Sequence, residues 1–365
     1  MSKDPRLSDD NKSVNDEIQD RIIRHQVYMQ GYETRVSNNV NKFLDEKVFP
    51  DLLRQIEKRL NTITATEKPF SKLTTRRLLA MKKFLEGATK KMSVEIMDNL
   101  IEELDLLASQ EIGWTVGMIN QETPVKLNLI TPSTQSVVSS IYSKPFAGET
   151  MAQWFGTFAA ATETRLTRAI QAGVIEGQTT QQITQRIVGT RANKFKDGVL
   201  NTTRNQATAL ARTAVSHVAN QSRNDVFLSN SDIIKGVQWV STLDTRTSVI
   251  CQNLDGDILP IDKGIRPPAH VNCRSTITPV LKSSRSIGLG TRSSMNGQVP
   301  SSTTYGEWLK GQPLSVQEDV LGKTKAKLFR SGGLTIDKFS NKNLQPLTLE
   351  QLLKKEPIAF EKANV

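Results

Sequence analysis

Residues 236–242 read Gly-Val-Gln-Trp-Val-Ser-Thr, and their apolar and polar side chains alternate as they do in a half-buried β-strand. Residues 275–281, Ser-Thr-Ile-Thr-Pro-Val-Leu, have the composition of a partner strand that ends at its proline. The longest uninterrupted helical pattern, residues 201–228, precedes the first strand. We therefore predict an α+β fold: a mainly helical N-terminal region, then a domain that combines helices with a small antiparallel sheet, then a helical tail.

Both cysteines of the chain and one of its three histidines lie between these two strands. Cys251, His270 and Cys273 have the spacing C-x18-H-x2-C, and a tight Asp-Gly turn at 255–256 could bring them together. Thiolate and imidazole are zinc ligands, but a structural zinc needs four. Three interpretations stay open: a zinc site or its relict, buried thiols beside a hydrogen-bonded histidine, or a disulfide. The candidates for a fourth ligand are Asp244, Asp255 and Asp257.

An ordered series of motifs runs through this part of the chain. It consists of Ala211-Arg212-Thr213 on a helix, residues 239–247 (Trp-Val-Ser-Thr-Leu-Asp-Thr-Arg-Thr), Cys251, Leu254-Asp255-Gly256, and residues 267–274 (Pro-Pro-Ala-His-Val-Asn-Cys-Arg). In this order they resemble the phage Mu F-like minor head protein domain, or MuF domain, over roughly residues 150 to 285. The residues that match the family's motifs are Arg212, Thr213, Asp244, Arg246, Thr247, Asp255, Gly256, Pro268 and Arg274. For Asp244 and Arg246 we favour a structural role, an ion pair or turn cap at the strand end.

The resemblance implies a minor component of a tailed-phage head that acts in head morphogenesis, is associated with the portal and the packaged DNA, and in some members leaves with that DNA. Many members carry a further cysteine three residues before the one that matches Cys251 and another two residues after the one that matches Cys273. This chain has Ser248 and Ser275 there. An acidic residue also commonly follows the Arg-Thr pair, where Ala214 stands. These departures weaken the expected metal site and any catalytic role for that carboxylate.

The chain is basic, with a formal net charge of +11. Between residues 186 and 292 there are fifteen Lys and Arg against seven Asp and no Glu, a local excess of eight. Positive charge of this kind favours polyanionic partners through counterion release. Arg212 and Arg223, eleven residues apart, would share one helix face, which could touch phosphates or simply be solvated. The candidate DNA-contacting residues are Arg212, Arg223, Lys194 and Lys196.

The remaining chain divides by composition. Its predicted parts are a disordered leader (1–13), a helical N-terminal domain (14–112), a linker or crossover (113–150), the MuF-like domain (151–285), a basic flexible linker (286–304) and a C-terminal docking tail (305–365). The N-terminal helices carry apolar stripes, one of them at Phe49, Leu53, Ile56, Leu60 and Ile63. Such stripes favour an ordinary helical bundle over a face reserved for a partner.

We therefore expect a structural protein from the interior of a phage head, made in the host cytoplasm, with no catalytic residues and with zinc as its one candidate cofactor. Its expected partners are the portal protein, packaged double-stranded DNA bound without sequence preference, and, as further candidates, the scaffolding or major capsid protein. No apolar run reaches the length of a membrane span. Two alternatives remain: a DNA-acting or toxin-type enzyme delivered with the genome, and a generic DNA-binding module of the host cell.

Overall fold

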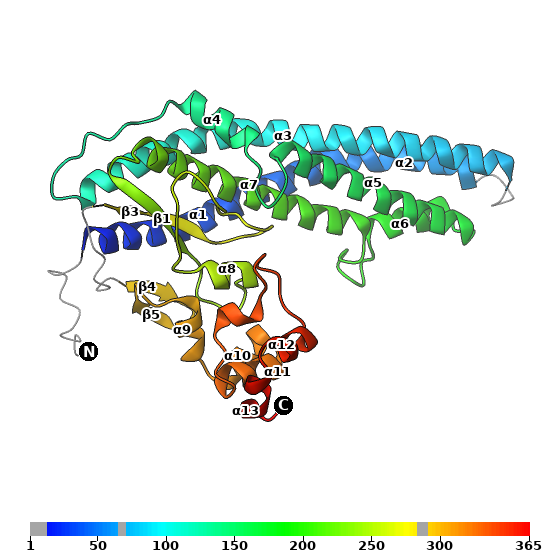
Figure 1. The fold of residues 1–365 in the computed structure, drawn as a ribbon. Helices are drawn as coiled ribbons and strands as arrows, with labels where there is room; N and C mark the ends of the chain where they lie inside the picture. Colours follow the sequence, from blue (N-terminus) through cyan, green and yellow to red (C-terminus); the bar gives the residue numbers. More distant parts are fainter. Residues whose placement is uncertain (1–12, 65–70, 283–290) are drawn as a thin grey trace. The chain divides into compact units, whose positions relative to one another are not determined.

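The fold of the chain is described by a computed structural model, which covers residues 13–64, 71–282 and 291–365 (Figure 1). The predicted leader therefore lies outside the described residues except for Ser13. The chain forms two compact units. The sheet unit comprises Met1–Gln30, Ala108–Val137 and Ser216–Val365, and the helical unit comprises Gly31–Leu107 and Val138–Val215. Three long helices contribute residues to both units: α1 (Val14–Phe43), α3 (Lys72–Glu122) and α7 (Val199–Ser229).

The helical unit contains, besides parts of those three helices, a short π-helical turn η2 (Leu44–Val48), α2 (Phe49–Thr64), α5 (Met151–Ile175) and α6 (Thr180–Val188). The short helix α4 (Thr134–Ser143) is divided between the units, which meet in sequence at Val137 and Val138. The predicted stripe on α2 is mostly buried, with Phe49, Ile56, Leu60 and Ile63 at most 3% exposed. Helices α5 and α6 each begin with a capping box, made by Thr150 and Thr179 respectively.

The sheet unit is built on three antiparallel strands in the order β2-β1-β3: β1 (Ile234–Val240), β2 (Ile258–Leu259) and β3 (Thr276–Leu281). Trp239 lies opposite Ile277, so the two strands expected from the sequence pair with each other. Apolar residues from the N-terminal part of α1, the C-terminal part of α3 and α7 pack on the sheet, among them Ile18, Ile119 and Phe227. The α+β fold class is confirmed.

The C-terminal segment belongs to the sheet unit and packs around its own apolar cluster. It consists of the hairpin β4 (Thr291–Ser294) and β5 (Gly297–Pro300), then α9 (Tyr305–Lys310), α10 (Leu314–Leu321), α11 (Lys323–Arg330), a 3₁₀ turn η3 (Ile336–Phe339), α12 (Leu349–Lys355) and α13 (Pro357–Ala363). Tyr305, Trp308 and Leu309 of α9 are buried in this cluster with Leu243, which follows β1.

Two predicted boundaries differ from the structure. The linker expected at 113–150 contains the last turns of α3, which continues to Glu122, and all of α4, because its apolar residues Met118, Ile119, Val137 and Ile141 are buried. The flexible linker expected at 286–304 contains the β4–β5 hairpin, since its Arg292 is tied into the core; residues 286–290 lie outside the described residues. In the part of the chain that the structure describes, no helix is long and apolar enough to cross a bilayer.

Candidate functional site

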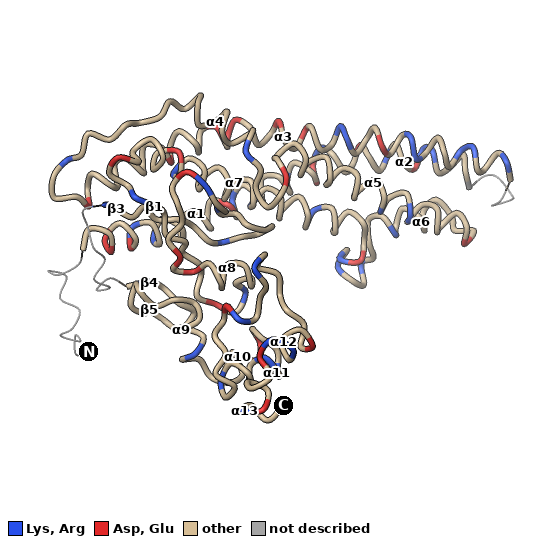
Figure 2. Tube along the Cα trace, in the orientation of Figure 1, with Lys and Arg blue, Asp and Glu red and all other residues tan. Residues whose placement is uncertain are grey.

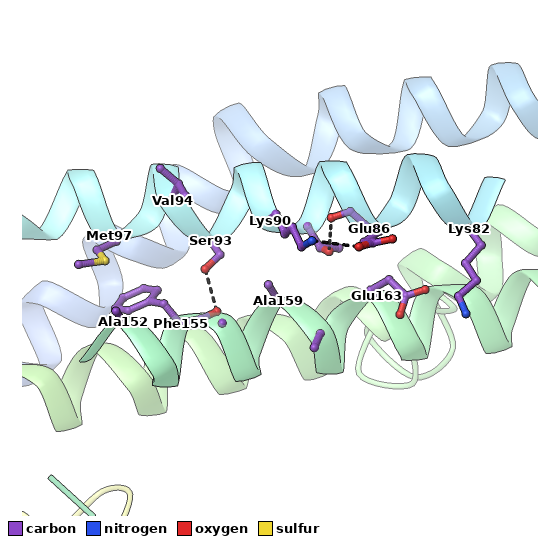
Figure 3. A pocket seen from close by; sticks show the side chains of 13 residues that line it. Lys82, Glu86, Lys90, Ser93, Val94, Met97, Ala152, Phe155, Ala159 and Glu163 are labelled. Carbon is purple, nitrogen blue, oxygen red and sulfur yellow. Dashed lines mark hydrogen bonds and ion pairs between the residues drawn. The ribbon is translucent and has the colours of Figure 1, made fainter. Parts of the chain in front are cut away.

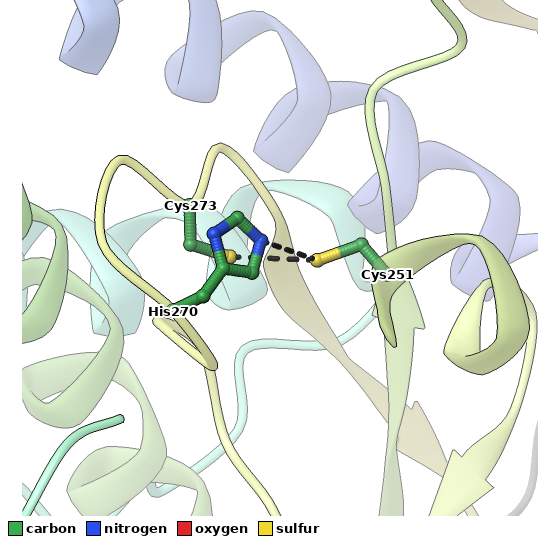
Figure 4. Close-up of side chains that lie close together, drawn as sticks. All are labelled: Cys251, His270 and Cys273. Atoms are coloured by element: carbon green, nitrogen blue, oxygen red, sulfur yellow. Dashed lines mark hydrogen bonds between the residues drawn. The ribbon is translucent and has the colours of Figure 1, made fainter. Parts of the chain in front are cut away.

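Three potential metal ligands converge at one end of the small sheet (Figure 4). Cys251 comes from α8 (Val249–Leu254), whereas His270 and Cys273 come from the loop that leads into β3. The Cys251 Sγ atom lies 3.3 Å from His270 Nε2 and 3.6 Å from Cys273 Sγ. The ligand atoms all lie within 4.8 Å of one another, and within the described ranges no other group of three such residues gathers in this way.

Local hydrogen bonds hold each member of the cluster in place. Ser248 caps the first turn of α8, where its hydroxyl accepts from the backbone N–H of Cys251. The backbone N–H of Cys273 donates to the carbonyl of His270 at 3.1 Å, which closes the turn between them. His270 Nδ1 lies 2.9 Å from the Val271 carbonyl, so this nitrogen carries the proton and Nε2 faces the sulfur atoms.

The cluster is nearly sealed from solvent. Cys251 and Cys273 are each 1% exposed and pack against Trp239 and Leu254, while His270 is half-buried. The indole N–H of Trp239 donates to the Ser241 hydroxyl, which in turn donates to the Cys251 carbonyl. The cysteines are free thiols in this packed environment. The sulfur atoms lie beside a hydrogen-bonded histidine, and the same three groups could also hold a metal ion.

The three groups shift one another's protonation. A hydrogen bond from the Cys251 thiol, together with the contact to His270, holds the pKa of Cys273 well below its ordinary value despite burial. The hydrogen bond to Cys273 and burial raise the pKa of the Cys251 thiol. The hydrogen bond to Cys273 also raises the pKa of His270. Of the two thiols, Cys251 therefore holds its proton more firmly than Cys273 does.

This donor set fits part of a zinc site. Two sulfur atoms and one imidazole nitrogen that face a common point could hold a metal ion, and this is the ligand chemistry zinc prefers. The fourth position is approached by the Ser248 hydroxyl, 2.7 Å from His270 Nε2. A hydroxyl is a weaker zinc ligand than the thiolate or carboxylate found in closed sites. The residues present thus fit a three-ligand site.

The carboxylates expected as a fourth ligand are engaged elsewhere. Asp244 is held by two hydrogen bonds from the Arg274 guanidinium, at 2.5 and 2.7 Å, and accepts from the Arg246 backbone. Although burial raises the pKa of Asp244, Arg274 outweighs it and keeps the pKa below its ordinary value. Asp257 is exposed on the strand side of the turn, outside the metal cluster. Asp244 therefore lies outside the metal cluster, and the ion pair and turn cap expected for Asp244 and Arg246 are present instead, with Arg274 as a second partner.

Asp255 has a role that the sequence did not reveal. Its carboxylate accepts two hydrogen bonds from Arg292, at 2.9 Å each, and one from the backbone N–H of Ser241 and of Tyr305. Both side chains are at most 3% exposed. This ion pair ties the end of α8 to β4 and α9. Gly256 follows with φ +89, so the Asp-Gly turn is present as predicted, but its carboxylate is an anchor for the C-terminal segment.

The other family-motif residues have structural contacts. Thr247 donates its hydroxyl to the Thr242 carbonyl, and Thr213 donates to the Ala209 carbonyl inside α7. Pro268 forms a cis peptide bond with Pro267 just before the cluster. Tyr305 donates its hydroxyl to the Asp244 carbonyl at 2.9 Å, which links the motif to the C-terminal segment.

The expected basic stripe on α7 is not a DNA-facing surface. Arg223 is completely buried; its Nε donates to Glu111 at 2.8 Å and its terminal nitrogen donates to Thr276 at 2.6 Å. Arg212 is half-buried. The prediction fails because α7 is covered on nearly all sides from Thr213 to Val226, so its polar residues face protein. Lys194 and Lys196, in contrast, are exposed.

A groove between α3 and α5 lies wholly within the helical unit (Figure 3). It has a volume of about 660 Å³ and an apolar lining that includes Val94, Met97 and Phe155. The Ser93 hydroxyl donates to the Phe155 carbonyl and Lys90 pairs with Glu86, so these polar groups of the groove have partners within the chain. The lining offers packing rather than chemistry, and the Cys251–His270–Cys273 cluster stays the candidate site.

Residues 161–278 match the family model described as Phage Mu protein F like protein. The resemblance read from the motifs is therefore confirmed, over a segment that begins inside α5 and ends inside β3. This Mu F-like segment contains the whole cysteine–histidine cluster, and its family indicates a phage head morphogenesis protein. Comparison with curated proteins and with solved structures found no match.

Proposed function

We propose that this chain is a minor head protein of a tailed phage, located inside the capsid and acting in head morphogenesis. The observation that carries the proposal is the match of residues 161–278 to the Phage Mu protein F like family. The ordered packing of that segment supports it, since its motif residues hold the fold together: Asp244 pairs with Arg274, and Asp255 pairs with Arg292.

We propose the portal protein as a partner of the helical unit, with the scaffolding or major capsid protein as further candidates. Helix α3 leaves large apolar side chains exposed, with Leu79 at 64%, Val94 at 57% and Leu106 at 57%. Isolated exposed apolar residues are ordinary, but several along one long helix suit contact with another protein. The packing stripe of α2 is mostly buried, whereas these residues of α3 are exposed and available for such a contact.

We propose packaged double-stranded DNA as the second partner, bound without sequence preference, and release of the chain with that DNA during ejection. The excess of positive charge between residues 186 and 292 supports an electrostatic contact. Arg223 is buried and cannot contact DNA, whereas Lys194 and Lys196 are exposed and remain candidate DNA-contacting residues. Such binding weakens steeply with salt.

We also propose that the role is structural rather than enzymatic. Cys251 and Cys273 are each 1% exposed, so neither sulfur is accessible to a macromolecular substrate. The cluster packs against Trp239 and Leu254 as part of an apolar core. A plasmid-nicking assay with added Mg²⁺, Mn²⁺ or Zn²⁺ tests this directly. Turnover by the wild type that a His270→Ala variant lacks would overturn it.

Localisation in the virion tests the main proposal. Cryo-electron microscopy of mature particles should show density for this chain inside the capsid, in contact with the portal vertex. Mass spectrometry of full particles and of particles emptied by ejection should show the chain in the first and its loss from the second. Finding the chain only outside the capsid, or absent from purified particles, would contradict a head role.

A further inference from the structure

The loop between α6 and α7, residues 190–197, belongs wholly to the helical unit (Figures 1 and 2). Every residue from Arg191 to Asp197 is exposed. Three of these seven residues are basic, at 191, 194 and 196, and Figure 2 shows blue segments, for Lys and Arg, on this loop. None of these three side chains belongs to the cysteine–histidine cluster or to the buried ion pairs.

Internal hydrogen bonds give this loop a fixed shape. The Asp197 carboxylate accepts from the backbone N–H and the hydroxyl of Thr190, both at 2.8 Å, and from the Asn193 amide at 2.9 Å. These bonds, that of Asn193 first, lower the pKa of Asp197 to about 2. The backbone N–H of Phe195 also donates to the Thr190 carbonyl at 2.8 Å. The one acidic group of the loop is thus engaged by hydrogen bonds within the loop itself.

Two glycines close the base of the loop. A Cβ atom on Gly198 would lie 2.3 Å from the backbone carbon of Val188, closer than real contacts allow. Gly189 has φ +100, and a Cβ there would lie 2.8 Å from the Phe195 carbonyl oxygen. The chain can leave α6 and return to α7 through so narrow a base because both positions lack a side chain.

The backbone at the tip of the loop is strained, although the side chains there are exposed and not packed in a core. Lys194 and Phe195 have φ +52 and +60, the left-handed region, which costs a residue other than glycine about 1–2 kcal/mol. Phe195 is nevertheless 46% exposed. Among the described residues, Arg191, Lys194 and Lys196 form no ion pair. Strain held at an exposed aromatic between free cations indicates a surface kept for binding.

We propose that the 190–197 loop is the element through which this chain holds the DNA backbone. This inference rests on the DNA contact proposed above, and it assigns that contact to the 190–197 loop. Arg191, Lys194 and Lys196 neutralise neighbouring phosphates, and Phe195 lies against the sugar faces at the groove edge. Both kinds of contact are independent of base sequence. The helical unit thereby contacts DNA through an ordered basic loop rather than through one face of a helix.

The test measures binding of the full chain to a 30-base-pair duplex of arbitrary sequence by fluorescence anisotropy over a series of salt concentrations. The loop variant carries Arg191→Gln, Lys194→Gln and Lys196→Gln. The matched control removes three exposed cations of the C-terminal segment, with Lys323→Gln, Lys327→Gln and Lys354→Gln. Each lost phosphate contact lowers the slope of log affinity against log salt by about 0.9, so the loop variant should lose about 2–3 in slope and the control almost nothing. Equal losses in both variants would overturn the assignment.

A second variant separates shape from charge. Asp197→Ala makes the loop more positive, so an unstructured patch of cations would bind DNA more tightly. If the fixed shape matters, the variant binds more weakly, by about tenfold, because Thr190 and Asn193 lose the acceptor that orders the tip. Circular dichroism and thermal melting check that the variant remains folded. Tighter binding by a folded Asp197→Ala protein would overturn the proposal.

The outcomes distinguish this inference from the function on which it rests. A wild-type chain that shows no DNA binding at low salt contradicts the DNA contact altogether and this loop with it. A wild-type chain that binds DNA while the loop variant binds equally well contradicts the loop alone. Vesicles of phosphatidylglycerol serve as a third arm: stronger retention on them than on the duplex, lost in the loop variant, would identify a membrane contact and overturn the proposal.

Discussion

The hydroxyl of Ser248 lies 2.7 Å from Nε2 of His270, the same nitrogen that faces Cys251 Sγ at 3.3 Å. A serine thus stands where a fourth ligand would complete the cysteine–histidine cluster. The second departure from the family pattern, Ser275, also hydrogen-bonds to Cys251, and this bond partly offsets the rise in the pKa of that thiol. Both positions that carry cysteine in many MuF domains therefore contact the cluster here, as hydroxyl groups.

Replacing the capping serine by cysteine should strengthen zinc binding. Ser248→Cys supplies a third thiolate at the open position, so zinc should bind at least about tenfold more tightly than to the wild type, which is 1.4 kcal/mol. Ser248→Ala is the matched control, because both variants lose the helix cap of α8, worth about 1 kcal/mol. Chelator competition measures the affinity. Equal affinities for the cysteine and alanine variants would show that Ser248 does not face the metal position.

The buried Asp255–Arg292 pair should be essential for holding the C-terminal segment. Asp255→Asn keeps the size of the side chain but leaves the Arg292 guanidinium buried without its counter-charge, which costs about 3–5 kcal/mol. Urea denaturation measures the loss, and limited proteolysis after residue 290 reports whether the segment detaches. The exposed neighbour Asp257→Asn should stay within about 0.5 kcal/mol of the wild type. A mild effect at Asp255 would mean that the apolar cluster around Trp308 suffices.

The pair of Glu111 and Arg223 predicts a pH dependence of stability. Burial raises the pKa of Glu111, but Arg223 and His25 outweigh it and hold the pKa below the ordinary value of 4.5. A carboxyl group with a lowered pKa stabilises the fold fully above its unfolded pKa, and this contribution is lost as the pH falls through the folded value. Glu111→Gln should therefore cost about 3–5 kcal/mol at pH 7, with a gap to the wild type that narrows in acid.

Urea denaturation at pH values from 7 down to 3 measures that gap for Glu111→Gln. The control is Glu122→Gln, which breaks an ion pair with the half-exposed Arg21 and should cost less than about 1 kcal/mol. A gap that stays constant across this pH range would show that the charge of Glu111 does not contribute.

Local patterns were sufficient to predict the pairing of β1 with β3 and the cluster. The alternation at 236–242 depends only on which side chains face the core, and its partner strand at 275–281 follows a short excursion. Cys251 and Cys273 are 22 residues apart across that excursion, so pairing of the strands brings them together. The strand pair and the convergence of Cys251, His270 and Cys273 therefore follow from features that are close in sequence.

Such local patterns could not predict the ion pairs between residues far apart in sequence. Arg223 and Glu111 are 112 residues apart, and Arg292 and Asp255 are 37 apart in a stretch whose composition is typical of a linker. The sequence around an arginine on a helix is the same whether its side chain faces solvent or pairs with a buried carboxylate. Only the packing of α7 against α3 shows that Arg223 belongs to the core, which is why its predicted contact with DNA is wrong.

Two glycines of the helical unit should respond to alanine in opposite ways. Gly198 sits where a Cβ would meet Val188 at 2.3 Å, so Gly198→Ala must displace the backbone at the base of the loop and destabilise the chain by about 1–3 kcal/mol. Gly156, in the middle of α5, has open space around its Cβ position, and Gly156→Ala should stabilise the chain by about 0.5–1 kcal/mol through helix propensity. Urea denaturation of the two variants compares them directly. If Gly198→Ala proved neutral, the narrow base of the 190–197 loop would not be what fixes its shape, and the hydrogen bonds within the loop, those to Asp197 among them, would be what holds it.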